Sequence, residues 1–250
     1  MTPFYYDPDI YDLMVDPLKR NDIPFWVGQS KPFKGAILEL FCGTGQIAQA
    51  LAASGKSVTG VDLSSGLVQF ARKKAKRAKL NIGYEVQDVL SLDFKGWEFE
   101  FVYAPMGSMA HLVRAAELKR FFTSVKKSLR SGGIFAIDVP NPNLNFLTRV
   151  KDDRFLISRY QDKKAKCEVI VEETGYYDPV RQINHLVWHQ RFSNGKCGES
   201  HELKLRVFYP EELKLLIESN GFKLLKRYGD YQGRPFRGTS PRQIVFCREK

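Results

Sequence analysis

Apolar and polar positions alternate in a regular order over residues 36–139. Between turns, short apolar runs typical of buried strands occur at 36–41, 57–62, 82–86, 98–104 and 134–139. Segments with a helical period separate several of them, at 46–54, 65–79 and 115–129. The last of these has one apolar face, formed by Leu118, Phe121, Phe122, Val125 and Leu129. Strands that alternate with helices predict a mainly parallel sheet with both faces covered.

The pattern changes after residue 140, where a loop rich in proline and asparagine begins. Candidate strands follow without intervening helices, at 167–177, 182–192 and 200–208. Turn-forming pairs, Asp178-Pro179 and Asn194-Gly195, stand between them. This predicts an inserted antiparallel β subdomain over residues 141–208. Helix 210–220 and strands 222–228 and 242–248 then return to the main sheet.

Residues 1–35 are rich in aromatic side chains and predict two short helices. One surrounds Tyr11, and the other includes Phe25 and Trp26 and ends near Gly28. We expect this segment to cover the open end of the sheet as a lid. The predicted organisation is therefore a lid over 1–35, a main domain over 36–140 and 209–250, and the insert.

The first apolar strand ends at two glycines, Gly43 and Gly45, and a helix follows at once. Glycines at such a turn let the backbone bend sharply and approach a ligand. Asp62 ends the second strand nineteen residues after Gly43, a spacing suited to binding two ribose hydroxyls. Gly43 to Ala48 also fits the dinucleotide pattern, so an NAD(P)-dependent oxidoreductase is one alternative. No second mononucleotide-binding half supports it.

Four short motifs resemble, in order, those of class I S-adenosylmethionine-dependent methyltransferases. They are Glu39-Leu-Phe-Cys-Gly43-Thr-Gly45, Val58-Thr-Gly-Val-Asp62-Leu-Ser, Gln87-Asp88-Val89 and Leu129-Arg-Ser-Gly132-Gly133. The resemblance covers residues 11–139 well and 208–247 moderately. It implies a Rossmann-like, doubly wound, seven-stranded α/β sheet with an antiparallel C-terminal hairpin edge. It also implies S-adenosyl-L-methionine as the cofactor.

The resemblance also assigns the residues that would hold this cofactor. We expect contacts from Glu39, Gly43, Gly45, Asp62, Leu63, Asp88, Val89 and Met106. Asp62 would accept from the ribose hydroxyls and Asp88 from the adenine amino group, while Glu39 would orient the glycine turn. The alternatives are that Asp62 caps the next helix and that Asp88 is a turn residue.

The loop after the fourth strand, residues 103–112, indicates the acceptor side. Amino-sugar N-methyltransferases and similar small-molecule enzymes sometimes carry a histidine here, and His111 matches that place. An imidazole there could take a proton from an amine or hydroxyl; the alternative is a helix residue bonded to backbone. Tyr11 is the second catalytic candidate, with packing alone as its alternative. The resemblance thus implies methyl transfer to nitrogen or oxygen of a small molecule.

The net charge of the chain indicates a second possible class of acceptor. The chain carries 39 basic and 28 acidic residues, a net charge of +11. A dense basic cluster lies on the predicted helix 65–79, formed by Arg72, Lys73, Lys74, Lys76, Arg77 and Lys79. Such runs are usually solvated helix faces, but they also keep an RNA or protein methyltransferase open. The signature for N-methylation of nucleic-acid bases is absent from Ala104-Pro105-Met106, which disfavours base methylation but not RNA methylation by other routes. A nucleic-acid partner is possible but not favoured.

Other polar residues carry weaker signals. His185 and His189 share one face of a predicted strand, but no third ligand is indicated, so we expect no metal. Arg234, Arg237 and Arg242 surround a glycine-rich loop and could bind an acidic substrate, although surface positions are commoner. The inserted strands could also form a homodimer contact.

Location is predicted from what the chain lacks. Its four cysteines are far apart, which suits reduced thiols. The sequence shows no run of eighteen apolar residues and no signal-peptide pattern at its start. We therefore expect a cytoplasmic protein without a membrane span.

Overall fold

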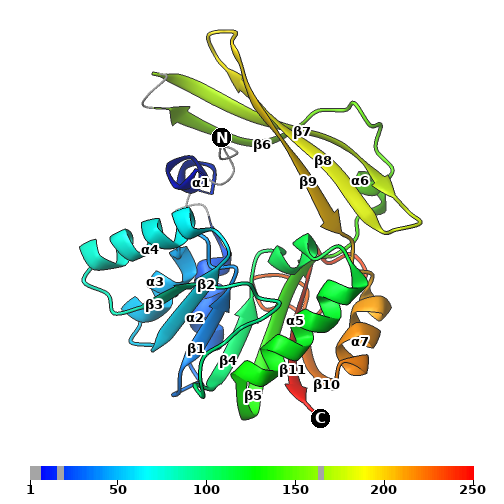
Figure 1. Ribbon diagram of the computed structural model, residues 1–250. Coiled ribbons are helices and arrows are strands. Elements are labelled where there is room, and N and C mark those ends of the chain that lie inside the picture. The colour runs from blue at the N-terminus through cyan, green and yellow to red at the C-terminus, as the bar shows by residue number, and fades with distance from the viewer. Residues whose placement is uncertain (1–6, 16–19, 163–165) are drawn as a thin grey trace. The chain divides into compact units, whose positions relative to one another are not determined.

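The computed structural model describes residues 7–15, 20–162 and 166–250, which form two compact units (Figure 1). The larger unit comprises residues 21–142 and 208–250. The smaller unit comprises the described residues of 1–20 together with 143–207. Each unit is built on its own sheet.

The larger unit contains a seven-stranded sheet with the order β10-β11-β5-β4-β1-β2-β3. Its strands are β1 (Ile37–Leu40), β2 (Val58–Asp62), β3 (Gly83–Val86), β4 (Phe99–Ala104), β5 (Leu129–Pro140), β10 (Phe222–Tyr228) and β11 (Arg242–Glu249). The first five pair in parallel, and β11 runs antiparallel to both β5 and β10. The predicted mainly parallel sheet with an antiparallel hairpin edge is confirmed.

Helices cover both faces of this sheet. On one face, α2 (Asp22–Ser30), α3 (Gln46–Ala53) and α4 (Ser65–Arg77) contribute to a large apolar core. Trp26 of α2 is fully buried there and stacks on Tyr103 of β4, with ring centroids 4.8 Å apart. On the other face, α5 (Ala115–Ser128) packs Phe121 and Phe122 against Phe135 of β5. A further helix, α7 (Pro210–Ser219), lies beside β10.

The smaller unit contains a four-stranded antiparallel sheet. Its strands follow the chain order, β6 (Phe155–Asp162), β7 (Cys167–Asp178), β8 (Ile183–Phe192) and β9 (Cys197–Arg206). The predicted antiparallel insert is therefore present, and β6 and the short helix α6 (Leu144–Leu147) add to the three strands expected. The periodicity of β6 is weak because this edge strand exposes both Leu156 and Ile157.

The N-terminal segment differs from the single lid that the sequence suggested. Helix α1 (Pro8–Met14) belongs to the smaller unit, where Ile10 and Met14 pack against Tyr160, Val169 and Val171. Helix α2 belongs to the larger unit. It continues past Gly28 to Ser30 because Gly28 does not adopt the left-handed backbone that ends helices. The segment therefore contributes to two separate cores, and its aromatic residues Phe25, Trp26 and Phe33 pack in that of the larger unit.

Among the described residues, no helix has both the length and the apolar character needed to cross a membrane.

Candidate cofactor-binding site

The glycine turn after β1 has an unusual backbone. Phe41, Gly43 and Gly45 all have positive φ, at 54°, 54° and 73°. Gly45 directly precedes α3, and its carbonyl accepts a hydrogen bond from the Tyr84 hydroxyl at 3.3 Å. A Cβ added to Gly45 would lie 2.2 Å from that hydroxyl oxygen. Glycine is therefore required here by the backbone and by Tyr84, a residue that sequence reasoning missed.

Asp62 connects the ends of β1 and β2. Its Oδ2 accepts from the Gly43 amide at 2.8 Å, and its Oδ1 accepts from the Ser64 amide at 2.9 Å. The helix cap is a different residue, because Ser64 Oγ accepts from the Leu67 amide of α4 at 3.3 Å. Burial raises the pKa of Asp62, and the backbone amides oppose that shift. Each carboxylate oxygen can accept a second bond, as a ribose diol requires.

Glu39, Cys42 and Tyr103 form a buried polar layer beneath the turn. Only 2% of Glu39 is exposed, and Tyr103 is fully buried. Burial, and next the charge of Glu39, raise the pKa values of the Cys42 thiol and the Tyr103 phenol. Both groups therefore stay protonated at neutral pH, so Cys42 is not an activated nucleophile.

The remaining predicted cofactor residues follow the ends of β2, β3 and β4. Leu63 exposes 72% of its area and Met106 exposes 40%, so both present apolar surface that could cover a flat base. Asp88 Oδ1 accepts from the Leu90 amide at 2.9 Å, and Val89 is buried. Because β1 to β4 are parallel neighbours, these residues occupy one edge of the sheet.

His111 ends the short 3₁₀ helix η3 (Ser108–His111), which begins after Gly107. The side chain is exposed at the same carboxyl edge. Asp138 of β5 fixes the start of this loop by accepting from the Met106 amide at 2.8 Å and from the Tyr231 hydroxyl at 2.7 Å. Arg242 Nε donates to the same carboxylate. Arg242 is thus largely buried, contrary to the surface position that the sequence favoured.

Tyr11 lies on α1 in the smaller unit. The glycine turn, Asp62 and His111 all lie in the larger unit. The expected approach of Tyr11 to the cofactor or acceptor therefore stays a prediction.

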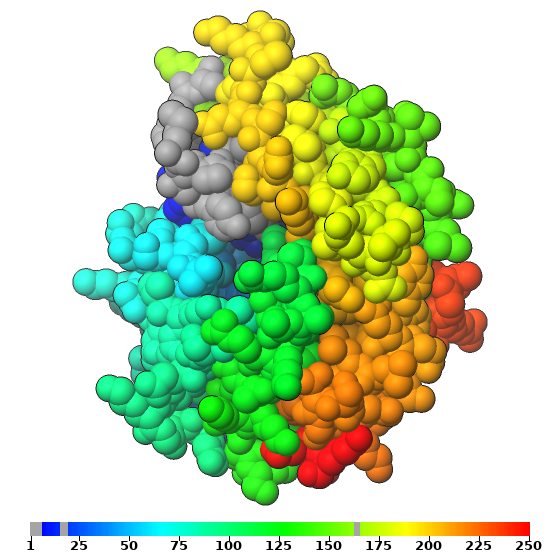
Figure 2. Space-filling model, turned by 45° about the vertical axis from the view of Figure 1, so that its right-hand side comes forward, coloured from blue at the N-terminus to red at the C-terminus, as the bar shows by residue number. Residues whose placement is uncertain are grey.

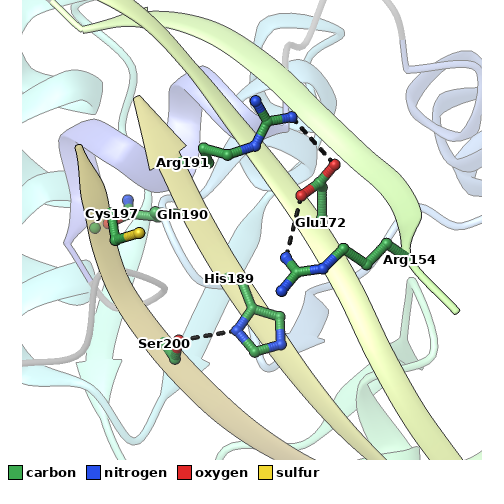
Figure 3. Close-up of a pocket in the computed structure, with 8 residues that line it drawn as sticks. Arg154, Glu172, His189, Gln190, Arg191, Cys197 and Ser200 are labelled. Carbon is green, nitrogen blue, oxygen red and sulfur yellow. Dashed lines mark hydrogen bonds and ion pairs between the residues drawn. The ribbon is translucent and has the colours of Figure 1, made fainter. Parts of the chain in front are cut away.

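A cavity of about 430 Å³ lies on the smaller unit (Figure 3). Glu172 bridges Arg154 and Arg191 there, at 3.2 and 3.3 Å. His189 Nδ1 contacts Ser200 Oγ at 3.0 Å, and its Nε2 contacts Thr174 Oγ1 at 2.9 Å. These side chains satisfy one another, and none of them was predicted to bind the cofactor.

The structure gives the two strand histidines different partners. His185 stacks on Tyr176 with ring centroids 4.7 Å apart, whereas His189 is bound by hydroxyls. In the part of the chain that is described, no cluster of three or more His, Cys, Asp or Glu could hold a metal ion.

Comparison with known proteins agrees with this geometry. Residues 37–133 match the family model described as a methyltransferase domain. The putative methyltransferase YqeM of Bacillus subtilis is 26% identical over 89% of this chain and 87% of its own length. Among solved structures, the CcbJ methyltransferase of Streptomyces caelestis superposes with a TM-score of 0.78, 22% identity and coverage of 92% and 96%. The sugar N-methyltransferase KedS8 of Streptoalloteichus superposes with a TM-score of 0.72 and 19% identity. The match covers 96% of this chain and 93% of the KedS8 chain.

The observed residues fit the cofactor that the fold implies. Gly43 and Gly45 carry no side chains in this turn, and the Asp62 carboxylate keeps acceptor capacity at the end of β2. Residues 37–133 thus form a methyltransferase domain, and the larger unit has the fold of class I S-adenosylmethionine-dependent methyltransferases. S-adenosylmethionine is the cofactor of that class, and the solved neighbour CalS10 is described as bound to it.

The first prediction concerns Gly45. We expect Gly45→Ala to destabilise the larger unit by about 2–5 kcal/mol, combining left-handed backbone strain with overpacking against Tyr84. Gly55→Ala is the matched control, because Gly55 has φ 84° with nothing within 4 Å of an added Cβ. It should cost only the backbone part, about 1–2 kcal/mol. Urea unfolding measures both; equal losses would contradict the role of Tyr84.

The second prediction concerns Asp62. Asp62→Asn keeps the size of the side chain but replaces one accepting oxygen with a donor. We expect at least a tenfold weaker affinity for S-adenosylhomocysteine by calorimetry, equivalent to about 1.4 kcal/mol. Asp93→Asn is the control, since exposed Asp93 makes a similar local bond to the Lys95 amide. Equal affinities in the two folded variants would remove Asp62 from the ribose site.

The third prediction is a pH dependence in the smaller unit. Burial, and next the charge of Arg154, lower the pKa of His189 from the ordinary 6.5, while Glu172 opposes them. The unfolded chain therefore binds this proton more readily, so stability falls as pH drops below 6.5. Hydrogen-exchange protection factors of residues 183–206, which are corrected for the intrinsic exchange rate, should fall over that range in the wild type.

His189→Gln should reduce this pH dependence, and His201, whose pKa burial also lowers, should carry the rest. The control His185→Gln, on the same strand, should preserve it. An unchanged slope in His189→Gln would show that other groups carry the effect.

Proposed function

We propose that the chain transfers the methyl group of S-adenosylmethionine to a nitrogen or oxygen of a small-molecule acceptor. The observation that carries this proposal is the loop after β4, which Asp138 fixes beside the cofactor edge and which presents His111. The similarity to KedS8, a sugar N-methyltransferase by its title, extends over 96% of this chain and supports the same class of acceptor.

The bound cofactor supplies a methyl group on a sulfonium, and the protein supplies position and electrostatics. The Gly43–Gly45 turn allows close backbone approach, and Asp62 would hold the ribose. Leu63 and Met106 offer apolar surface at the same edge. Holding the acceptor atom in line with the methyl group can lower the barrier by about 7–11 kcal/mol.

His111 would take the proton that the acceptor loses. An amine or hydroxyl must release a proton as the new bond to carbon forms, and a neutral imidazole accepts it near neutral pH. The side chain is exposed at the end of η3, so an acceptor at the carboxyl edge can reach it.

The exposed face of α4 supports a second candidate, a methyltransferase acting on RNA. Exposed basic residues of this region are Arg72, Lys73, Lys76, Arg77 and Lys79, and Figure 2 shows the surface of α4 in cyan. However, Arg72 donates to the Tyr84 carbonyl and so serves to attach α4 to β3. Tight RNA binding at low salt that weakens steeply with added salt would favour this candidate over ours.

Calorimetry with S-adenosylhomocysteine and NADH, followed by an acceptor screen of amines, amino sugars and phenols, tests the proposal. We expect binding of S-adenosylhomocysteine alone and turnover with a small acceptor. His111→Ala should then lower kcat by about 10²–10⁴-fold, the usual contribution of a general base. Its affinity for S-adenosylhomocysteine should stay within twofold. Wild-type turnover in this variant would return His111 to a structural role, and preference for NADH would overturn the proposal.

A further inference from the structure

A guanidinium group is held at the carboxyl edge of the larger unit, at the start of β11. Arg242 Nε donates to Asp138 Oδ1, and the guanidinium carbon lies 5.2 Å from the centre of the Tyr231 ring. Tyr231 in turn donates to Asp138 at 2.7 Å and packs on Phe25 of α2. Arg242 is therefore fixed by a carboxylate and a ring that are themselves held in place.

One nitrogen of the Arg242 guanidinium has no hydrogen-bond partner among the described residues. This nitrogen is Nη2, and it is buried. Leaving a buried charged donor unsatisfied is costly, so such groups usually face a water, ion or ligand. Nη2 lies 3.9 Å from the position that a Cβ on Gly107 would occupy. The donor thus borders the loop that leads to His111.

Arg242 lies several strands away from the glycine turn of the predicted cofactor site. Going from β11 to β1 takes three strand steps, through β5 and β4. Neighbouring strands lie about 4.8 Å apart, so Arg242 is about 14 Å from the glycine turn measured across the sheet. Apart from Met106, the predicted cofactor residues lie in or directly after β1 to β3, on the far side of β4. We therefore assign a ligand group that meets Arg242 to the acceptor.

We propose that Arg242 binds an anionic oxygen, carboxylate or phosphate, on the methyl acceptor. This inference rests on the proposed function, since it specifies the acceptor of the same site. A guanidinium presents planar, parallel N–H donors that match both anions.

The surrounding carboxylates do not cancel this role. Asp138 already accepts from the Met106 amide, Tyr231 and Arg242, so its charge is spread over three donors. Asp22 of α2 is the second buried acid nearby, and its charge and that of Asp138 help to keep Arg242 protonated. The reserved Nη2 donors stay available for an incoming anion.

The test titrates inorganic phosphate, and separately acetate, into the protein saturated with S-adenosylhomocysteine, and follows the arginine Nε–H resonances. We expect a saturable shift of one arginine with at least one of the two anions. Arg242→Gln should weaken that binding at least tenfold. The matched control is Arg237→Gln, because Arg237 is an exposed arginine of the loop before β11. This variant should bind the anion within twofold of the wild type.

Removing Arg242 alone leaves Asp138 buried without its cation, so the single variant can unfold. Asp138→Asn/Arg242→Gln removes both charges and so leaves no unpaired buried charge, and it should also lose the anion response. S-adenosylhomocysteine affinity should stay within twofold in each folded variant, which shows that the cofactor half is intact.

The outcomes separate the two proposals. A stronger response to phosphate indicates a phosphorylated acceptor, and a stronger response to acetate indicates a carboxylate. Retained S-adenosylhomocysteine binding with no anion response in the wild type, or an undiminished response without Arg242, overturns this inference alone. A wild-type protein that does not bind S-adenosylhomocysteine overturns the proposed function instead.

Discussion

The hydrogen bond from the Gly43 amide to the Asp62 carboxylate is the constraint on which the cofactor site depends. It joins residues nineteen positions apart, at the ends of two strands whose register pairs Leu40 with Val61. Tyr84 of the neighbouring strand β3 donates a hydrogen bond from its hydroxyl to the Gly45 carbonyl and so holds the other end of the turn. Three adjacent strands thus determine one turn, so the backbone that meets the cofactor cannot shift without disturbing the sheet.

Local patterns in the sequence were enough to predict that turn and the strands around it. The apolar runs, the glycine pair and the acid that ends β2 can each be recognised from a few neighbouring residues. Tyr84 and Asp138 could not be found in this way. Their partners lie 39 and 32 residues away in the chain, and only the strand order brings them together. An isolated tyrosine or aspartate in a strand carries no sign of such a bond.

Arg242 shows why a residue's neighbours in sequence can mislead. It follows a stretch rich in glycine, proline and arginine, which is typical of an exposed loop. Because β11 runs antiparallel to β5, however, the first residue of β11 pairs with Pro140 at the carboxyl edge of the parallel strands. The reversal of one strand therefore turns a loop arginine into a buried one, and Asp138 supplies the charge that makes this burial tolerable.

A gain in folding stability does not by itself explain why Asp138 and Arg242 form a buried ion pair. Replacing a buried ion pair with well-packed apolar residues is often neutral or stabilising, whereas removing one partner costs about 3–5 kcal/mol. Asp138 also accepts from the Met106 amide and the Tyr231 hydroxyl, so the pair fixes a loop and leaves the Arg242 Nη2 donor beside it. In the proposed function, most cofactor contacts lie at β1 to β3, while β4, β5 and β11 orient the group that receives the methyl. A charge that adds little to folding is explained if it positions the acceptor.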